Sequence, residues 1–105
     1  MEISVVARTK AKPGCENALE QAFKEAVQAT HQEIGCQRYA LHRGIDDPSI
    51  FIMIERWDSS ADLDQHLKTS HIQTLFSKIP QLVISEPEIL KLNLIPAGDQ
   101  KKSSL

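Results

Sequence analysis

The sequence has no long hydrophobic run, little net charge and few aromatic residues. Its longest apolar stretch is the five-residue segment "IFIMI" at 50–54, which is far too short to span a bilayer. Strand-like "ISVVAR" begins at residue 3, so we expect no signal peptide. The balanced charge gives no reason to expect an anionic membrane as partner. The formal charge is only -2 and no basic stripe is present, which gives no electrostatic reason to expect a nucleic-acid partner.

Cysteine is also scarce. The chain has two, Cys15 and Cys36, which are too few and too irregularly placed for a disulfide framework or a zinc site. We predict that both are free thiols. Free thiols suit a reducing cytoplasm, which is therefore the expected location.

Several motifs that bind cofactors or carry out catalysis are absent. There is no Gly-x-Gly-x-x-Gly, no phosphate-binding loop and no Gly-x-Ser-x-Gly, which removes nucleotide cofactors and serine hydrolysis in their common forms. There is also no His-Glu-x-x-His and no facial-triad pattern, so we predict no metal site. Flavin and haem require no short linear motif, so these absences do not address them.

What the sequence does contain is the periodicity of one globular domain. Its 105 residues, 41% of them hydrophobic and 25% charged, are typical of a folded protein with a single core. The alternation and spacing of apolar residues predict a strand at 3–12, a helix at 16–34, strands at 36–44 and 49–58, two short helices between 59 and 80, and a strand at 88–95. This order predicts an α+β, ferredoxin-like β-α-β-β-α-β domain over residues 1–96, with Pro80 closing the last helix and a polar, disordered tail at 97–105.

The third predicted strand is apolar on both faces. Alternation places Ile50, Ile52 and Ile54 on one face and Phe51, Met53, Glu55 and Trp57 on the other. Helices cover only one face of such a sheet, so the second apolar face needs another partner. We therefore predict a homodimer that packs sheet against sheet, with the isoleucine face at the interface.

Four polar or aromatic side chains are expected to converge under the helices. Tyr39 belongs to the bulkier face of the second strand, so we place it with Glu55 and Trp57, and His66 lies on the apolar face of the following helix. A buried carboxylate is destabilising unless it is paired, hydrogen-bonded or protonated. Glu55 is therefore either a structural group that pairs with Arg8, Arg43 or a histidine, or a functional one that shares a proton with His66 beside a ligand.

His71 is the less certain member of this group. It follows His66 by five residues, which is about 140 degrees round an unbroken helix. A helix break, which Ser70 suggests, would be needed to bring both rings to one ligand. We place His71 at the mouth of the predicted pocket.

Two longer stretches resemble a known family. "GCQRYALHR" and "FIMIERWDSSADLDQHLKTSHIQ" are similar to the antibiotic biosynthesis monooxygenase (ABM) domain, and the likeness extends over about residues 2 to 95. The resemblance implies a dimeric α+β barrel joined partly through the last strand, around 90–95. It also implies a pocket bordered by Glu55, Trp57, His66 and His71, with Tyr39 and Phe51 as its floor. The haem-degrading branch uses an asparagine on the first strand, which "ISVVARTKAK" lacks.

The leading hypothesis is a cofactor-independent monooxygenase that oxidises a small phenolic or quinol substrate with dioxygen. The residues proposed as catalytic are His66, Glu55 and Trp57, and the substrate would also contact Tyr39, Phe51, Met53 and His71. Two alternatives remain open: a domain that binds or isomerises a small apolar ligand without oxygen, and a dimeric interaction module with a filled core. An open cavity beside Glu55 would favour the first two.

Overall fold

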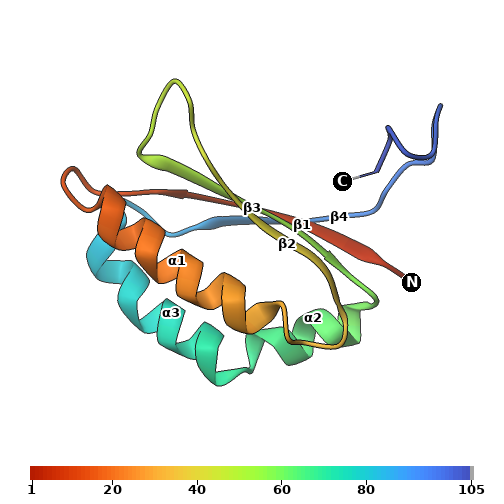
Figure 1. Cartoon of the computed structure of the whole chain (residues 1–105), viewed down its shortest axis with the longest axis horizontal. Coiled ribbons are helices and arrows are strands. Elements are labelled where there is room, and N and C mark those ends of the chain that lie inside the picture. The colour runs from red at the N-terminus through yellow and green to blue at the C-terminus, as the bar shows by residue number, and fades with distance from the viewer. Residues whose placement is uncertain (105) are drawn as a thin grey trace.

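The structure, a computed structural model, describes residues 1–104 and contains the predicted order of elements (Figure 1). The elements are β1 (Ile3–Lys10), α1 (Glu16–Thr30), β2 (Cys36–Arg43), β3 (Ile50–Trp57), α2 (Ser60–Leu67), α3 (Ser70–Leu82) and β4 (Glu88–Leu92). The strands form one antiparallel sheet in the order β2-β3-β1-β4. The ferredoxin-like α+β fold predicted from the sequence is confirmed.

All three helices lie on one face of the sheet. Figure 1 shows α1 and α3 running side by side beneath the strands, with α2 following at the end where β3 finishes. No helix of the described chain covers the opposite face. The layers therefore leave one sheet surface without helices, while the space between the sheet and the helices holds the core.

The core follows the predicted alternation of β3. Phe51, Met53, Glu55 and Trp57 are buried, and the isoleucines between them are only half-buried. Tyr39 of β2 is buried on the helix side as expected. The chain thus carries one carboxylate into a mainly apolar layer.

The first helix ends earlier than predicted, and this matters for the site. It begins after the turn at Pro13-Gly14, where Gly14 has a φ of 87°, and it ends at Thr30 instead of near Gly35. Residues 31–35 form a turn that lies against the start of α2. A Cβ at Gly35 would come within 2.3 Å of Asp62 Cγ, so this close approach requires glycine.

Two predicted boundaries near the C-terminus differ from the structure. The prediction that Pro80 closes the helix is wrong, because α3 continues through it to Leu82. Burial of Ile79 and Val83 on either side of Pro80 stabilises this last turn despite the lost backbone donor. The last strand ends at Leu92 and is shorter than the predicted segment 88–95.

Other expectations concern the termini, the thiols and the surface. Both cysteines are free, as predicted.

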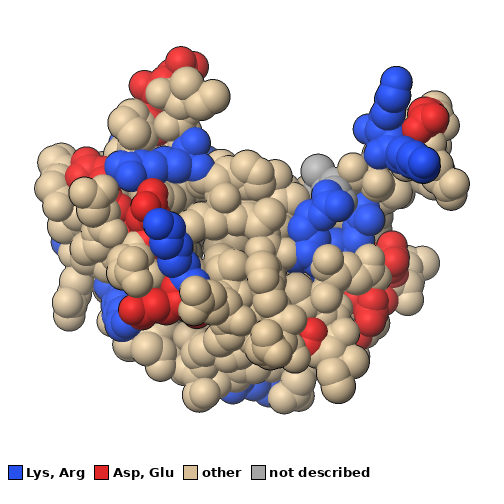
Figure 2. All heavy atoms as spheres, in the orientation of Figure 1, with Lys and Arg blue, Asp and Glu red and all other residues tan. Residues whose placement is uncertain are grey.

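The domain boundary at 96 and the disorder of 97–105 stay predictions, and Leu105 lies outside the described residues. Within residues 1–104, none of the helices has the length and apolar character needed to cross a bilayer. Figure 2 shows basic and acidic side chains intermixed on the visible face, without a continuous basic stripe.

Candidate functional site

A cavity of about 200 Å³ lies between the sheet and helices α2 and α3. Its walls are mainly apolar and include Val5, Met53, Leu63, Ile72 and Leu75. The polar or charged lining groups are Thr9, Tyr39, Glu55, His66 and Lys91. The two half-exposed lining residues Phe76 and Ile89 indicate that this central cavity opens between α3 and β4.

The strand register explains why the polar groups meet. Glu55 lies opposite Tyr39 of β2 and opposite Val5 of β1, and Val5 lies opposite Lys91 of β4. These four residues form one row across the sheet, and all of them line the central cavity. Two groups with ionisable oxygens, Tyr39 and Glu55, therefore sit next to each other on its floor.

Glu55 is held by the indole of Trp57. The Trp57 Nε1 group donates a hydrogen bond of 3.0 Å to Glu55 Oε1. Among residues 1–104, Glu55 pairs with neither Arg8 nor Arg43, and Arg43 contacts Glu20 instead. Burial raises the pKa of Glu55 to about 7, with the indole hydrogen bond opposing the shift. Near neutral pH this carboxyl group can therefore exist with or without its proton.

Tyr39 is the second oxygen group on the floor. Burial raises the pKa of its phenol, and the neighbouring carboxylates Glu55 and Glu33 add to the shift. The hydroxyl therefore keeps its proton at neutral pH, and the nearby side chain of Thr30 opposes the rise in pKa.

His66 enters the cavity from the last turn of α2. Its ring packs against Trp57 at 4.4 Å and edge-on against Tyr39 at 5.2 Å between ring centroids. Its Nδ1 lies 2.7 Å from Glu33 Oε2, so the observed carboxylate partner is Glu33 and not Glu55. Burial lowers the pKa of His66, and the hydrogen bond with Glu33 opposes the shift.

This pairing fixes the tautomer of the His66 ring. An ionised carboxylate accepts hydrogen bonds only, so Nδ1 carries the hydrogen and donates to Glu33. In the neutral ring, Nε2 is then unprotonated. No hydrogen-bond partner for Nε2 is found among residues 1–104, which leaves it free to accept a proton from a molecule in the cavity.

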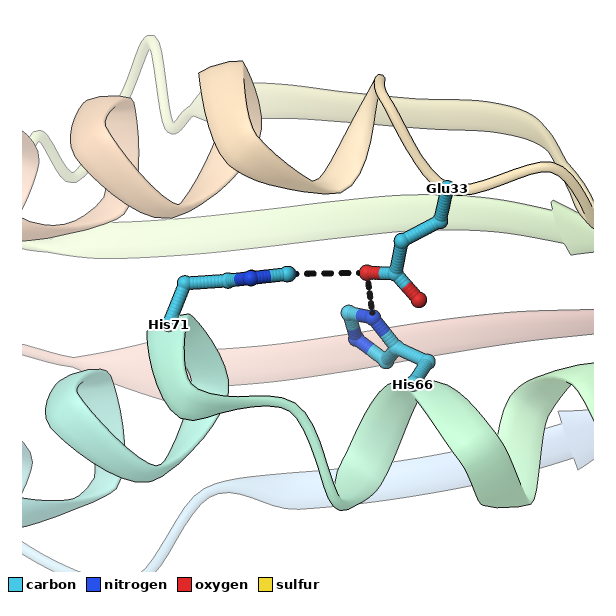
Figure 3. Close-up of side chains that lie close together, drawn as sticks. All are labelled: Glu33, His66 and His71. Carbon is cyan, nitrogen blue, oxygen red and sulfur yellow. Dashed lines mark hydrogen bonds and ion pairs between the residues drawn. The ribbon is translucent and has the colours of Figure 1, made fainter.

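A second histidine bonds the same carboxylate oxygen. The Nε2 of His71 lies 2.8 Å from Glu33 Oε2 and 3.2 Å from Thr69 Oγ1. Figure 3 shows the three side chains converging from the turn after α1, the end of α2 and the start of α3. The break between α2 and α3 makes this possible, as the spacing of His66 and His71 required.

Sequence reasoning missed Glu33, which is the centre of this arrangement. It was assigned to the end of the first helix, and no short motif links it to histidines 33 and 38 positions later. The one available signal was Gly35, because a glycine required by a close approach marks a place where two segments touch. We call Glu33, His66 and His71 the Glu33 cluster.

The structure separates the seven predicted site residues. Tyr39, Met53, Glu55 and His66 line the central cavity. Trp57 is fully buried behind them and holds Glu55. His71 lines a separate surface hollow instead of the mouth of the cavity. Phe51 does not line the cavity, because its ring packs on Phe23 at 5.8 Å, below the guanidinium of Arg43.

Comparison with known proteins identifies the family. The family model for antibiotic biosynthesis monooxygenase matches residues 2–78, which is most of the chain. The chain belongs to this family.

Its ABM relatives cover nearly the whole domain at low identity. "Putative monooxygenase YcnE" of Bacillus subtilis is 25% identical over 92 residues, which cover 88% of this chain and 97% of that protein. "Probable quinol monooxygenase YgiN" of Escherichia coli is 26% identical over 102 residues, covering 88% and 92%. A crystal structure of a protein from Pseudomonas aeruginosa superposes with a TM-score of 0.86 at 29% identity, covering 90% and 95%. The family resemblance inferred from the sequence is therefore confirmed.

Within this ABM domain, the arrangement combines three chemical capacities. Apolar walls exclude water from a bound molecule, and His66 Nε2 can accept a proton. Glu55 adds a carboxyl group that can gain or lose a proton near pH 7.

Proposed function

We propose that this protein oxidises a small phenolic or quinol-type aromatic with dioxygen and uses no cofactor. The observation that carries the proposal is the position of His66, which lines an apolar cavity and is backed by the Glu33 carboxylate. An apolar protein cavity of about 150 Å³ is known to hold benzene. A cavity of about 200 Å³ therefore suits a molecule of one or two rings, or a slightly larger one that reaches the opening.

The proposed chemistry starts with the substrate hydroxyl. His66 Nε2 accepts the phenolic proton, and the Nδ1–H···Glu33 hydrogen bond stabilises the imidazolium that forms. The resulting phenolate is electron-rich and transfers one electron to dioxygen. The phenoxyl radical and superoxide then combine at a ring carbon.

The remaining steps leave one oxygen atom on the substrate. For an anthrone-like substrate, the peroxide loses its O–O bond as the CH2 carbon becomes C=O, and the second oxygen leaves as water. The four electrons that dioxygen takes up come from that carbon, so no external reductant is needed. Apolar walls keep bulk water away from the radical pair.

The relatives support oxygen chemistry in general terms. One bears the name of a putative monooxygenase and another that of a probable quinol monooxygenase, at 25% and 26% identity. Because one scaffold can host many functions, the substrate class is argued from the cavity and its polar groups.

Oxygen uptake tests the proposal. We expect uptake with menadiol or anthrone above the rate without protein, and a loss of at least about tenfold in His66→Ala, since general-base catalysis contributes about 10²–10⁴-fold. His42→Ala is the matched control, because His42 is exposed and does not line the central cavity. Equal uptake by wild type and His66→Ala would remove His66 from the mechanism.

A second candidate uses the same residues without oxygen. A carboxyl group with a pKa of about 7 beside a histidine can shuttle a proton between carbon atoms, so the cavity also suits an isomerase or a ligand-binding domain. An oxygen electrode separates the two, because isomerisation consumes no dioxygen. The open cavity argues against the third hypothesis, a filled core without a site.

We further propose that the protein is a homodimer through the uncovered sheet face. Ala40, Ile54, Val6 and Leu90 lie opposite one another on neighbouring strands and form an apolar row across this face. Leu90 is 48% exposed, and no helix of the described chain covers it. A second copy would remove this surface from water.

A further inference from the structure

Although the sequence motifs predicted no metal site, we propose that the Glu33 cluster binds a divalent transition-metal ion of the zinc type. Glu33, His66 and His71 offer one carboxylate oxygen and two ring nitrogens, all within 4.8 Å of one another. The three side chains come from three different segments, so the folded chain presents these donors together. Binding at this site does not depend on the oxidation proposed above.

The distances show that the donors already point at one place. His66 Nδ1 and His71 Nε2 lie 2.7 and 2.8 Å from the same oxygen, Glu33 Oε2, and a hydrogen fills each gap (Figure 3). One metal ion could replace these two hydrogens. In tetrahedral zinc sites, with metal–ligand bonds of about 2.0–2.2 Å, neighbouring donor atoms are about 3.3 Å apart.

The movement required involves all three donors. Glu33 Oε2 would need to withdraw from each nitrogen by roughly half an ångström to reach that donor separation. The two nitrogens, which lie within 4.8 Å of each other, would need to be about 3.3 Å apart. Glu33 lies in the turn between α1 and β2, where its side chain is not fixed by a helix or strand. The His66 ring, in contrast, is held between Trp57 and Tyr39, so it supplies a fixed donor.

The kind of donor selects the kind of ion. Two imidazoles and one carboxylate suit zinc and neighbouring transition metals, whereas calcium and magnesium prefer oxygen ligands. Three protein ligands leave a fourth position for water. These three donor side chains therefore predict a transition-metal ion with at least one water ligand.

The site is sheltered and yet reachable. The side chains of His66 and Glu33 are 3% and 16% exposed, and that of His71 is 22% exposed. His71 borders a surface hollow with Thr74 and Lys78, which gives the ion a route from solvent. The Lys78 ammonium is 3.2 Å from Glu25, and this carboxylate offsets its repulsion of a cation.

A bound ion would also affect His66 chemistry, and this consequence rests on the proposed function. The metal would take Nδ1, so the ring hydrogen would have to reside on Nε2, the nitrogen that is to accept the substrate proton. Zinc is therefore expected to inhibit the oxidation. The binding experiment below does not use turnover, so metal binding and oxidation can fail separately.

Titration calorimetry with Zn²⁺ and the visible absorption of added Co²⁺ test the site on the purified full chain. We expect one ion per chain, and a loss of affinity of at least roughly tenfold in His71→Ala and in Glu33→Gln, because each removes a ligand or its charge. Exposed His42 supplies the matched control, and His42→Ala should bind within about twofold of wild type. Circular dichroism shows whether each variant is folded.

Two variants keep the test decisive. His71 is partly exposed and Gln preserves the size of Glu33, so at least one variant should fold. Wild type that binds no Zn²⁺ at an ion concentration of about 100 μM, which corresponds to a free energy near -5.5 kcal/mol, would overturn the proposal. Equal affinity in wild type and a folded His71→Ala protein would overturn it as well.

Discussion

The buried carboxyl of Glu55 gives a prediction that can be worked through in energy. Replacing it by glutamine keeps the size of the side chain and its ability to accept from Trp57 Nε1, but removes its titration. Burial raises the pKa of Glu55 from 4.5 to about 7. The folded protein therefore holds a proton at this position that the unfolded chain releases at lower pH.

The sign and size follow from linkage. Between pH 4.5 and about 7 the folded state binds more protons than the unfolded state, so the free energy of unfolding falls as pH rises. One pKa unit corresponds to about 1.36 kcal/mol, so a shift of this size amounts to roughly 3 kcal/mol. This stability is fully present below pH 4.5 and is lost as pH rises through 7.

The assay is urea denaturation of wild type and Glu55→Gln at a fixed protein concentration across pH 4.5 to 8. Between pH 4.5 and 8, the free energy of unfolding of wild type should fall by roughly 3 kcal/mol more than that of Glu55→Gln. The difference in free energy of unfolding should therefore favour the variant most at pH 8. Glu88→Gln on exposed strand β4 is the control and should follow wild type. A stability difference between wild type and Glu55→Gln that does not change with pH would refute the reasoning.

Three further predictions address the dimer, the turn and the cavity. Light scattering should give a dimer for wild type and a monomer for Ile54→Lys, since a charge would enter the apolar row; a wild-type monomer at micromolar concentration would contradict the dimer. Gly35→Ala should reduce the free energy of unfolding by about 1–3 kcal/mol in urea, because its Cβ would come within 2.3 Å of Asp62; unchanged stability would show that the turn can move away. Ala7→Phe should fill part of the central cavity and abolish oxygen uptake in a protein that still folds, and full activity would place the substrate elsewhere.

Much of the fold could be predicted from hydrophobic periodicity. The alternation of β3 placed Met53 and Glu55 under the helices, because a strand with period two has only two faces to assign. Element ends were less predictable, since they depend on tertiary packing. Helix α3 continues past Pro80 because Ile79 and Val83 are buried in the core. Local helix propensity depends on the residue type alone and cannot predict that burial.

The candidate site could be predicted only in part. Tyr39, Glu55 and His66 were found because each lies on an inward face of a regular element. The partner of His66 was missed because Glu33 sits in a turn, where side-chain direction follows no period. Phe51 shares the inward face of β3 with Met53, yet it packs against Phe23, which lines the cavity, and does not line the cavity itself. A face assignment does not say which part of the core is hollow.

The most direct test of the central claim is the fate of labelled oxygen. Anthrone would be incubated with ¹⁸O2 and either wild type, His66→Ala or no protein, and the product analysed by mass spectrometry. We predict that wild type places one ¹⁸O atom in the product at a rate at least about tenfold above His66→Ala. Label incorporation at the rate found without protein would contradict the account of His66 and the central cavity as an oxygenase site.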